Sequence, residues 1–289
     1  MIDKNRIAVS CTSGGYKNVF SQGVLKAFEE KNIRADAYAA CSSSVLVAAY
    51  AAIGKVRNIG LSLWEEGYRI SRMVGNTQSQ AMLYSIGQTE ADIKKELWLP
   101  ESSRLLVATS YVKTEEASSM TQTDLAKRLG QKLVLDSLRK RSDWKDRHLQ
   151  LRMFDTRPIE TTWPLEKDNF EEVAYATTRV LHAWDIPANI GSEPYVDGCY
   201  TCVSPVLPLA SLGYRKIICI TNEHDKTYLD LFSSEAIPEK VGDSRVIFIK
   251  PDENLKEVGV DYFSFTEEGI REAFRQGYEK GLAFDAFNF

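Results

Sequence analysis

Short apolar segments alternate with longer amphipathic segments along the whole chain. The apolar segments run for four to nine residues, too short for a buried helix, and several are rich in Val or Ile, as buried strands are. They are residues 6–10 (RIAVS), 37–40 (AYAA), 104–112 (RLLVATSYV), 149–154 (LQLRMF), 216–221 (KIICIT) and 245–249 (RVIFI). Strands that alternate with helices predict an α/β fold, in which a mainly parallel sheet carries helices on both faces.

The segments between these strands predict helices, because their apolar residues recur three and four positions apart. The predicted helices are residues 19–30, 43–53, 58–73 and 169–181, a helix through Leu125, Leu129 and Leu133, and a C-terminal helix through Ile270, Phe274 and Tyr278. Ser264 and Glu267 predict the N-terminal capping box of the last helix. Residues 75–88 (GNTQSQAMLYSIGQ) show no clear period and predict a loop or flap.

Length and charge narrow the class of protein. The chain has 289 residues, 44% of them hydrophobic, which is enough for a sizeable core, and no repeat or linker divides it. We therefore expect one domain over residues 1–289. The net charge of −4 argues against a nucleic-acid partner, because phosphate neutralisation needs a basic surface. No apolar run approaches the ~20 residues that cross a bilayer, and the start, MIDKNRIAVSC, lacks the features of a signal peptide. We expect an intracellular, cytoplasmic protein.

The five cysteines favour reduced thiols over disulfides or a metal site. Their number is odd, and no signal peptide directs the chain to an oxidising compartment. Cys199 and Cys202 form a single CxxC without a second pair or matching histidines, so we expect no bound metal. We interpret this CxxC as two small residues in a tight loop, with a redox role as the alternative. Because Cys11, Cys41 and Cys199 lie beside the candidate site below, oxidation of a thiol there is expected to lower activity.

Three loops follow predicted strands, where parallel sheets of this kind place their sites. The first, residues 13–18 (SGGYKN), has adjacent glycines, Gly14 and Gly15, that let backbone N–H groups turn into one concavity. Such donors can hold an oxyanion or a phosphate, and an ordinary glycine turn is the alternative. The loop is not a Walker motif, which needs Gly-Lys-Ser/Thr at a set spacing.

The second loop contains Ser42, between the strand at 37–40 and the helix at 43–53. At the N-terminus of a helix the dipole stabilises negative charge by ~0.3–1 kcal/mol. Residues 40–44 (ACSSS) parallel the Gly-x-Ser-x-Gly nucleophile elbow, with Ala40 and Ser44 at the glycine positions. The alternative is that Ser42 or Ser43 caps the helix.

The third loop contains Asp197 and Gly198, after the short apolar pair Tyr195 and Val196. A carboxylate at this position can orient or deprotonate a serine hydroxyl. The alternative is an Asp-Gly turn, which is very common.

Together and in this order, the three loops resemble the patatin-like phospholipase family. That family is marked by a glycine-rich oxyanion loop, a Gly-x-Ser-x-Gly elbow and an Asp-Gly that completes a serine–aspartate dyad. The flanking sequences are also similar: RIAVSCTSGGYKNVFSQGVLKAFEEKNI, DAYAACSSSVLVAAYAA, VAYATTRVLHAWDIP and EPYVDGCYTCVSPVLPLASLGYRKIICI. The resemblance covers about residues 5–55 and 170–222.

The resemblance implies a three-layer α/β/α sandwich and the hydrolysis of acyl esters, typically of lipids, with no metal or other cofactor in the dyad chemistry. Carried over by position, Ser42 is the nucleophile and Asp197 is its base. Gly14 and Gly15 supply the oxyanion-binding backbone, and Lys17 occupies the family's basic position. The implied partner is a lipid or another acyl-ester substrate.

The chain departs from the family at the glycines. Ser13 replaces the first glycine of the oxyanion loop, and Asn18 stands where a later glycine is usual. Ala40 and Ser44 add atoms where the elbow's neighbours pass close, and a small misplacement of the hydroxyl can cost ~10²-fold in rate. The main alternative is therefore a patatin-like protein that has lost catalysis and binds acyl ligands or a protein partner.

Two other features allow rival interpretations. His224 follows the strand at 216–221 and Asp197, so a Ser–His–Asp triad in the chain order of an α/β-hydrolase is the rival mechanism. Residues 138–148 (LRKRSDWKDRH) are the most basic stretch, and we interpret them as a solvated helix end. Peripheral contact with an anionic membrane, with Trp144 at the headgroup level, is the alternative.

Overall fold

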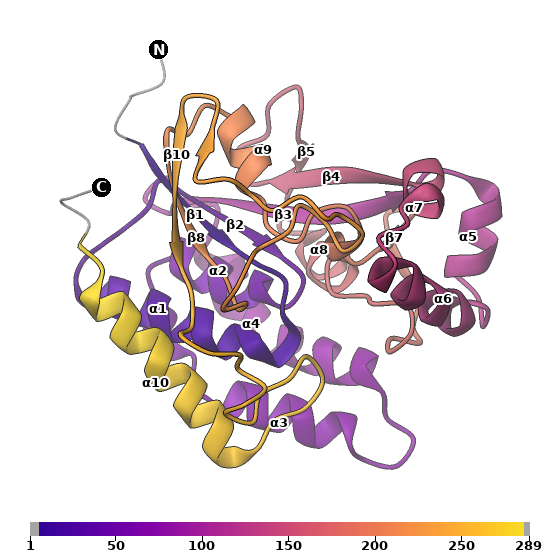
Figure 1. Ribbon diagram of the computed structural model, residues 1–289, viewed down its shortest axis with the longest axis horizontal. Helices are drawn as coiled ribbons and strands as arrows, with labels where there is room; N and C mark the ends of the chain where they lie inside the picture. Colours follow the sequence, from indigo (N-terminus) through magenta and orange to yellow (C-terminus); the bar gives the residue numbers. More distant parts are fainter. Residues whose placement is uncertain (1–5, 286–289) are drawn as a thin grey trace.

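Five parallel strands form the centre of the molecule. The computed structural model describes residues 6–285, and the strands lie in the order β3-β2-β1-β8-β10 (Figure 1). Their bounds are β1 Ile7–Cys11, β2 Ala37–Cys41, β3 Arg104–Val112, β8 Lys216–Ile220 and β10 Ser244–Ile249. The chain winds outward from β1 in both directions, so β1 lies where the strand order reverses. In such sheets ligands bind at the carboxyl ends of the strands near this point.

Shorter and antiparallel strands extend this central sheet. β4 Leu149–Asp155 runs antiparallel to β3 and carries the two-residue β5 Trp163–Pro164, while β9 Lys240–Val241 closes the other edge against β10. β3 is longer than β2, and its far end pairs with β7 Glu193–Val196, which in turn pairs with β6 Ala188–Ile190. The pairing of Ser110 with Val196 therefore brings the end of β7 to the carboxyl end of the sheet.

The two faces of the sheet bury alternate residues of each strand. In β1, Val9 and Cys11 belong to one core cluster, whereas Ala8 belongs to the other. The first cluster packs under α1 Asn18–Glu30, α2 Ser44–Ala52, α4 Gln78–Glu96, α8 Phe170–Ala176 and α10 Glu267–Ala283, and the second packs under α9 Val206–Ser211. This period of two confirms the predicted α/β fold, a mostly parallel central sheet with helices on both sides.

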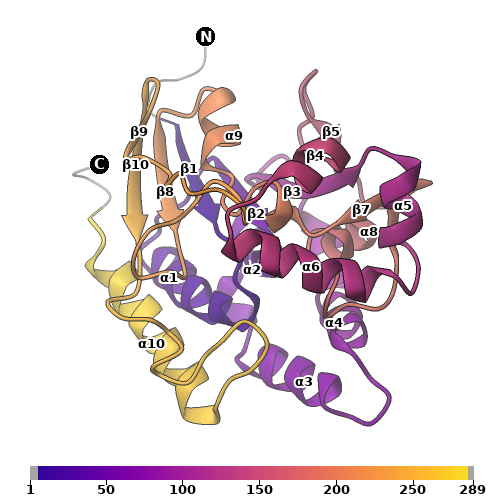
Figure 2. The same ribbon diagram turned by 45° about the vertical axis from the view of Figure 1, so that its right-hand side comes forward.

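The remaining helices lie in two groups. Figures 1 and 2 both show α3 Ser62–Ser71 beside α4, and α5 Glu115–Thr121, α6 Ala126–Leu138 and α7 Asp143–His148 grouped near β4 and β7. Short 3₁₀ turns occur at Gly15–Lys17 (η1), Val56–Asn58 (η2) and Gly198–Tyr200 (η3). Within residues 6–285, no helix is long and apolar enough to cross a membrane.

Two local predictions were wrong. Residues 75–88 are not a loop or flap, since α4 begins at Gln78 with a capping box in which Ser79 N–H donates to Thr77 Oγ1 and Thr77 N–H donates to Gln80 Oε1. Its buried face includes Ser79 and Thr89 beside apolar residues, which obscures the helical period in the sequence. The last helix is capped by Thr266, whose Oγ1 accepts from the Gly269 N–H, and not by Ser264.

Candidate active site

Ser42 lies in a strained turn between β2 and α2. Its φ angle is +59°, in the left-handed region that L residues rarely adopt. Such a conformation costs roughly 1–3 kcal/mol and persists only where the surroundings hold it. Here the Ser42 N–H donates to Thr177 Oγ1 at 2.9 Å, and the Thr177 hydroxyl donates to the Ala108 carbonyl at 2.6 Å. Thr177 therefore anchors the turn to β3.

The Ser42 hydroxyl donates a hydrogen bond to Asp197 Oδ2 at 2.8 Å. Asp197 directly follows β7 and is fully buried, and its other oxygen, Oδ1, accepts from the Cys199 N–H at 2.7 Å. Burial raises the pKa of Asp197 from 3.8 to about 6, although the bonds from Cys199 and Ser42 act in the opposite direction. The result is a carboxylate whose proton affinity is much higher than that of an ordinary aspartate.

Gly198 allows this close approach of the Asp197 loop to the sheet. A Cβ atom at position 198 would overlap the Ala108 carbonyl and lie 2.9 Å from Cys41 Sγ. The Gly198 N–H also donates to the Thr177 carbonyl at 3.1 Å. Thr177 thus holds Ser42 through its side chain and the Asp197 loop through its backbone. The Asp-Gly pair is more than a common turn here, because only glycine leaves room for the contact.

The glycine loop (residues 13–18) follows β1 and faces the same region. Gly15 has a φ of +54°, and a Cβ there would overlap the Tyr262 carbonyl, which accepts the Tyr16 N–H at 3.2 Å. Within residues 6–285, neither the Gly14 N–H nor the Gly15 N–H donates to a protein group. The loop therefore carries two adjacent free donors beside the turn that holds Ser42, an arrangement able to bind an oxyanion.

Lys17 does not extend toward Ser42. Its side chain is buried, with Nζ 3.0 Å from Glu223 Oε1 and 4.3 Å from the centre of the Tyr262 ring. Glu223 also accepts from the Tyr262 hydroxyl at 2.7 Å. Lys17 consequently ties the glycine loop to the segment after β8, which is a positional role.

The other two serines of the turn are bound to different loops. The Ser43 hydroxyl donates to the Gly15 carbonyl at 2.8 Å and lies 2.7 Å from the Asn18 side-chain amide, so it does not cap α2. The Ser44 hydroxyl lies 2.8 Å from the Cys41 carbonyl and 3.2 Å from the Cys11 carbonyl, and accepts from the Cys41 N–H. Ser44 therefore occupies a glycine position of the elbow with its hydroxyl satisfied.

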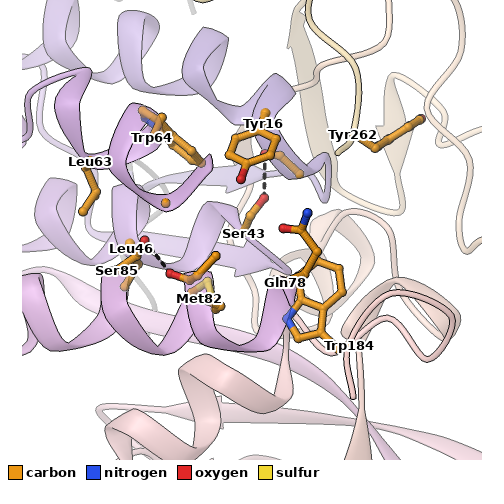
Figure 3. A pocket seen from close by; sticks show the side chains of 13 residues that line it. Tyr16, Ser43, Leu46, Leu63, Trp64, Gln78, Met82, Ser85, Trp184 and Tyr262 are labelled. Carbon is orange, nitrogen blue, oxygen red and sulfur yellow. Dashed lines mark hydrogen bonds between the residues drawn. The ribbon is translucent and has the colours of Figure 1, made fainter. Parts of the chain in front are cut away.

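A pocket opens beside the turn, between α3 and α4 (Figure 3). It has a volume of about 550 Å³, including space open to solvent. Gly15 and Ser43 form part of its wall, and the figure shows Ser43 between Leu63 on one side and Trp184 on the other. The pocket therefore adjoins both the glycine loop and the residue that follows Ser42.

Thr177 and Asn18 are the site residues that sequence reasoning missed as functional. Thr177 lies in VAYATTRV, a segment that matched the family, and the available signal was a hydroxyl residue directly after a predicted helix. That helix ends at Ala176 and not at Leu181, which places Thr177 at its C-terminus. Asn18 was noted only as a departure from glycine, whereas its buried amide joins the glycine loop to Ser43.

The rival residues lie in other surroundings. His224 Nε2 contacts Asp225 at 3.3 Å, and among the described residues no histidine hydrogen-bonds to Ser42 or Asp197. All five thiols are free and buried, and burial raises the pKa of each one, so none is poised as a thiolate. Residues 6–285 contain no cluster of three or more His, Cys, Asp or Glu side chains able to hold a metal.

The basic stretch is partly packed against the protein. The Trp144 ring lies 5.0 Å from the His148 ring and packs against the core cluster of α5 and α6. Lys145 Nζ pairs with Asp230 at 2.9 Å. These contacts account for Trp144 and Lys145 without a membrane, which stays an untested alternative for the remaining basic residues.

Comparison with known proteins finds structural likeness at low sequence identity. No family model and no curated protein matches the chain. Among solved structures, VipD from Legionella pneumophila is similar with a TM-score of 0.45 and 9% sequence identity. The alignment covers 97% of this chain and 66% of the VipD chain, just under two thirds. A likeness of this extent leaves the function to be argued from the chain's own residues.

Proposed function

We propose that this protein is a serine acyl-ester hydrolase that acts on lipids, with Ser42 as nucleophile and Asp197 as its base. The observation that carries the proposal is the 2.8 Å hydrogen bond from Ser42 Oγ to a fully buried carboxylate, in a turn where Ser42 has a φ of +59°. A strained serine at a strand–helix junction is the geometry of a nucleophile elbow. The resemblance of the three loops to patatin-like phospholipases supports the same chemistry.

The reaction would proceed in two steps, acylation of Ser42 and hydrolysis of the acyl-serine. Ser42 Oγ attacks the ester carbonyl carbon while its proton passes to Asp197, and the N–H groups of Gly14 and Gly15 bind the oxyanion. One good donor in comparable sites contributes ~3–4 kcal/mol. The intermediate collapses as the C–O bond to the alcohol breaks, and Asp197 returns the proton to the leaving oxygen. Water then attacks the acyl-serine, gives its proton to Asp197, and the carboxylic acid leaves as Ser42 recovers its proton.

The raised pKa of Asp197 makes it a better base than a solvated aspartate. A carboxylate with a pKa near 3.8 has little affinity for a serine proton, whereas a pKa of about 6 brings the base closer to neutral pH. Above pH 6 the Asp197 carboxyl group is still ionised in most molecules. This balance between ionisation and basicity is typical of tuned catalytic carboxylates.

Labelling with a fluorophosphonate probe tests the proposal. We expect a covalent adduct on the peptide that contains Ser42, and its loss in Ser42→Ala. Ser211→Ala, which removes an exposed serine at the end of α9, is the matched control and keeps the adduct. A folded protein that forms no adduct at Ser42, or that hydrolyses an activated ester equally well as Ser42→Ala, would overturn the assignment in favour of a non-catalytic acyl-binding protein.

A further inference from the structure

We propose that the pocket between α3 and α4 binds an unbranched alkyl chain of about eight carbons, the acyl chain of the ester that Ser42 cleaves. The inference rests on the proposed function and deepens it by naming the acyl group. It is based on the pocket and not on the geometry of Ser42 and Asp197, so the alkyl-binding proposal and the hydrolase proposal can be tested separately.

The chemistry of the wall calls for an apolar, uncharged occupant. None of the thirteen residues that line the pocket is charged. Two polar atoms of the wall away from Gln78 and Trp184 are already bonded, since Trp64 Nε1 donates to Gln22 Oε1 at 2.6 Å and Ser85 Oγ donates to the Ala81 carbonyl at 3.0 Å. An anionic head group would lose its hydration in this pocket without gaining a cationic partner, whereas an alkyl chain gains from burial.

The two ends of the pocket differ in polarity. Leu63 and Ser85 lie at one end in Figure 3, and Gln78 and Trp184 lie at the other. Trp184 Nε1 is buried and has no hydrogen-bond partner within residues 6–285. A buried donor without a partner costs free energy unless a ligand supplies an acceptor. We infer that the polar end of the ligand lies near Trp184 and that the alkyl tail runs toward Leu63.

The spacing of residues along α4 sets the length of chain that fits. Gln78 and Ser85 are seven residues apart in this helix, which corresponds to about 10 Å at 1.5 Å per residue. An extended alkyl chain advances roughly 1.3 Å per carbon, given C–C bonds of about 1.5 Å. About eight carbons therefore span the pocket.

Gly67 keeps the tail end of the pocket open. A Cβ at position 67 would lie 3.2 Å from Ser85 Oγ on the facing helix, so any larger side chain projects into the space between the helices. Gly67→Leu should shorten the pocket from α3, and Ser85→Leu should do so from α4. Gly87 provides the matched control, because it lies on α4, is exposed and has no atom within 4 Å of an added Cβ.

Calorimetric titration of Ser42→Ala with 1-butanol and 1-octanol tests the pocket without any chemistry. Each buried methylene should raise affinity about fourfold, so octanol should bind more than 100-fold more tightly than butanol. Gly67→Leu in this background should weaken octanol binding at least tenfold and change butanol binding less than twofold, and Gly87→Leu should match its parent. Equal affinities for the two alcohols, or an unchanged octanol affinity in both Gly67→Leu and Ser85→Leu, would overturn the proposal.

Fluorophosphonates with short and long alkyl groups then separate the two hypotheses in the wild-type chain. Adduct formation at Ser42 that does not depend on alkyl length would leave the hydrolase standing and remove the pocket. Chain-length-dependent binding of alcohols without any adduct would keep the pocket and remove the hydrolase.

Discussion

At the scale of single residues, three adjacent serines hold three separate parts of the site together. Ser42 donates to the buried carboxylate, Ser43 donates to the carbonyl of the glycine loop, and Ser44 bonds the end of β1. The three serines look interchangeable in the sequence. In the strained turn, however, their side chains point in different directions, so each hydroxyl binds a different partner. The serine at the centre of the elbow is the one that meets the carboxylate.

The pH dependence of labelling should report the state of Asp197. Only its ionised form can take the Ser42 proton, and its pKa is about 6. We expect the labelling rate to fall about tenfold per pH unit below pH 6 and to level off above it, and Asp197→Asn to be slow at every pH. Histidines titrate in the same range, so His224→Ala is the control and should keep the wild-type profile. A midpoint near pH 4 would contradict the assignment of Asp197.

The same carboxyl group should lower stability at neutral pH. The folded state holds the Asp197 proton up to pH of about 6, whereas the unfolded chain releases it near 3.8. This contribution to stability is present below pH 4 and is lost as the pH rises through 6; two pKa units correspond to roughly 3 kcal/mol. Asp197→Asn should therefore raise the Tm at pH 8 and raise it less at pH 4, as calorimetry can measure. If the Tm of Asp197→Asn at pH 8 lies below that of the wild type, the buried carboxylate of Asp197 does not lower the stability of the fold.

Thr177 should act as a positioning residue for Ser42. Thr177→Val keeps the shape of the side chain but removes the acceptor of the Ser42 N–H and the donor to Ala108. The turn can then relax, and we expect the maximal labelling rate to fall ~10²-fold while the affinity for the probe changes little. Thr177→Ser restores the hydroxyl and should recover most of the rate. Equal loss in both variants would indicate a packing role only.

At the scale of elements, the turn between β2 and α2 forms without the usual glycines of an elbow. Ala40 is buried within β2, where it pairs with Cys11 and Val107. The Ser44 hydroxyl hydrogen-bonds to the backbone of Cys11 and Cys41. These hydrogen bonds take the place of the close backbone packing that a glycine at this position would allow. The substitutions are therefore compatible with a formed turn.

Restoring glycine at position 44 should weaken the fold without improving the site. Ser44→Gly leaves buried backbone groups of Cys11 and Cys41 short of a partner, which costs about 1–3 kcal/mol. We expect a lower urea midpoint and a labelling rate no higher than that of the parent. Faster labelling of Ser44→Gly would mean that the serine obstructs the elbow.

The sequence predicts the buried strands well because their periodicity and burial agree. The strand predicted at residues 104–112 has the bounds of β3. The predictions for β2, β4, β8 and β10 differ from the structure by one residue at one end, and the prediction for β1 begins and ends one residue too early. α4 was missed because a helix that lines a pocket mixes apolar and polar residues on one side. The contacts of Thr177 join residues 135 and 69 positions apart, which no local pattern encodes.

At the scale of the whole molecule, the site is assembled from the carboxyl ends of strands on both sides of β1. The glycine loop follows β1 and Ser42 follows β2. Asn222 follows β8, and its Nδ2 donates to the Ser13 carbonyl at 3.3 Å. β7 brings Asp197 from the antiparallel extension of β3. Because these segments are distant in sequence, the site forms only once the sheet has formed.

The C-terminal helix also supports the site. α10 lies along α1 in both Figures 1 and 2, and the two helices approach through glycines: a Cβ on Gly277 would overlap the Phe20 carbonyl, and a Cβ on Gly23 would overlap the Phe274 carbonyl. The segment just before α10 contains Tyr262, whose carbonyl accepts the Tyr16 N–H. Docking of α10 therefore positions the residue that packs on the glycine loop.

Gly277→Leu should separate these two helices and disturb the glycine loop at a distance. The leucine side chain has no space against α1, so we expect a loss of about 1–3 kcal/mol in unfolding free energy. The segment that contains Tyr262 leads directly into α10, so we expect displacement of this helix to shift Tyr262. The labelling rate of Ser42 should then fall at least tenfold at a temperature where circular dichroism shows a folded protein. Gly87→Leu adds the same side chain in open space on α4 and should change neither quantity. If Gly277→Leu lowers stability but labels at the wild-type rate, the C-terminal helix stabilises the fold without positioning the site.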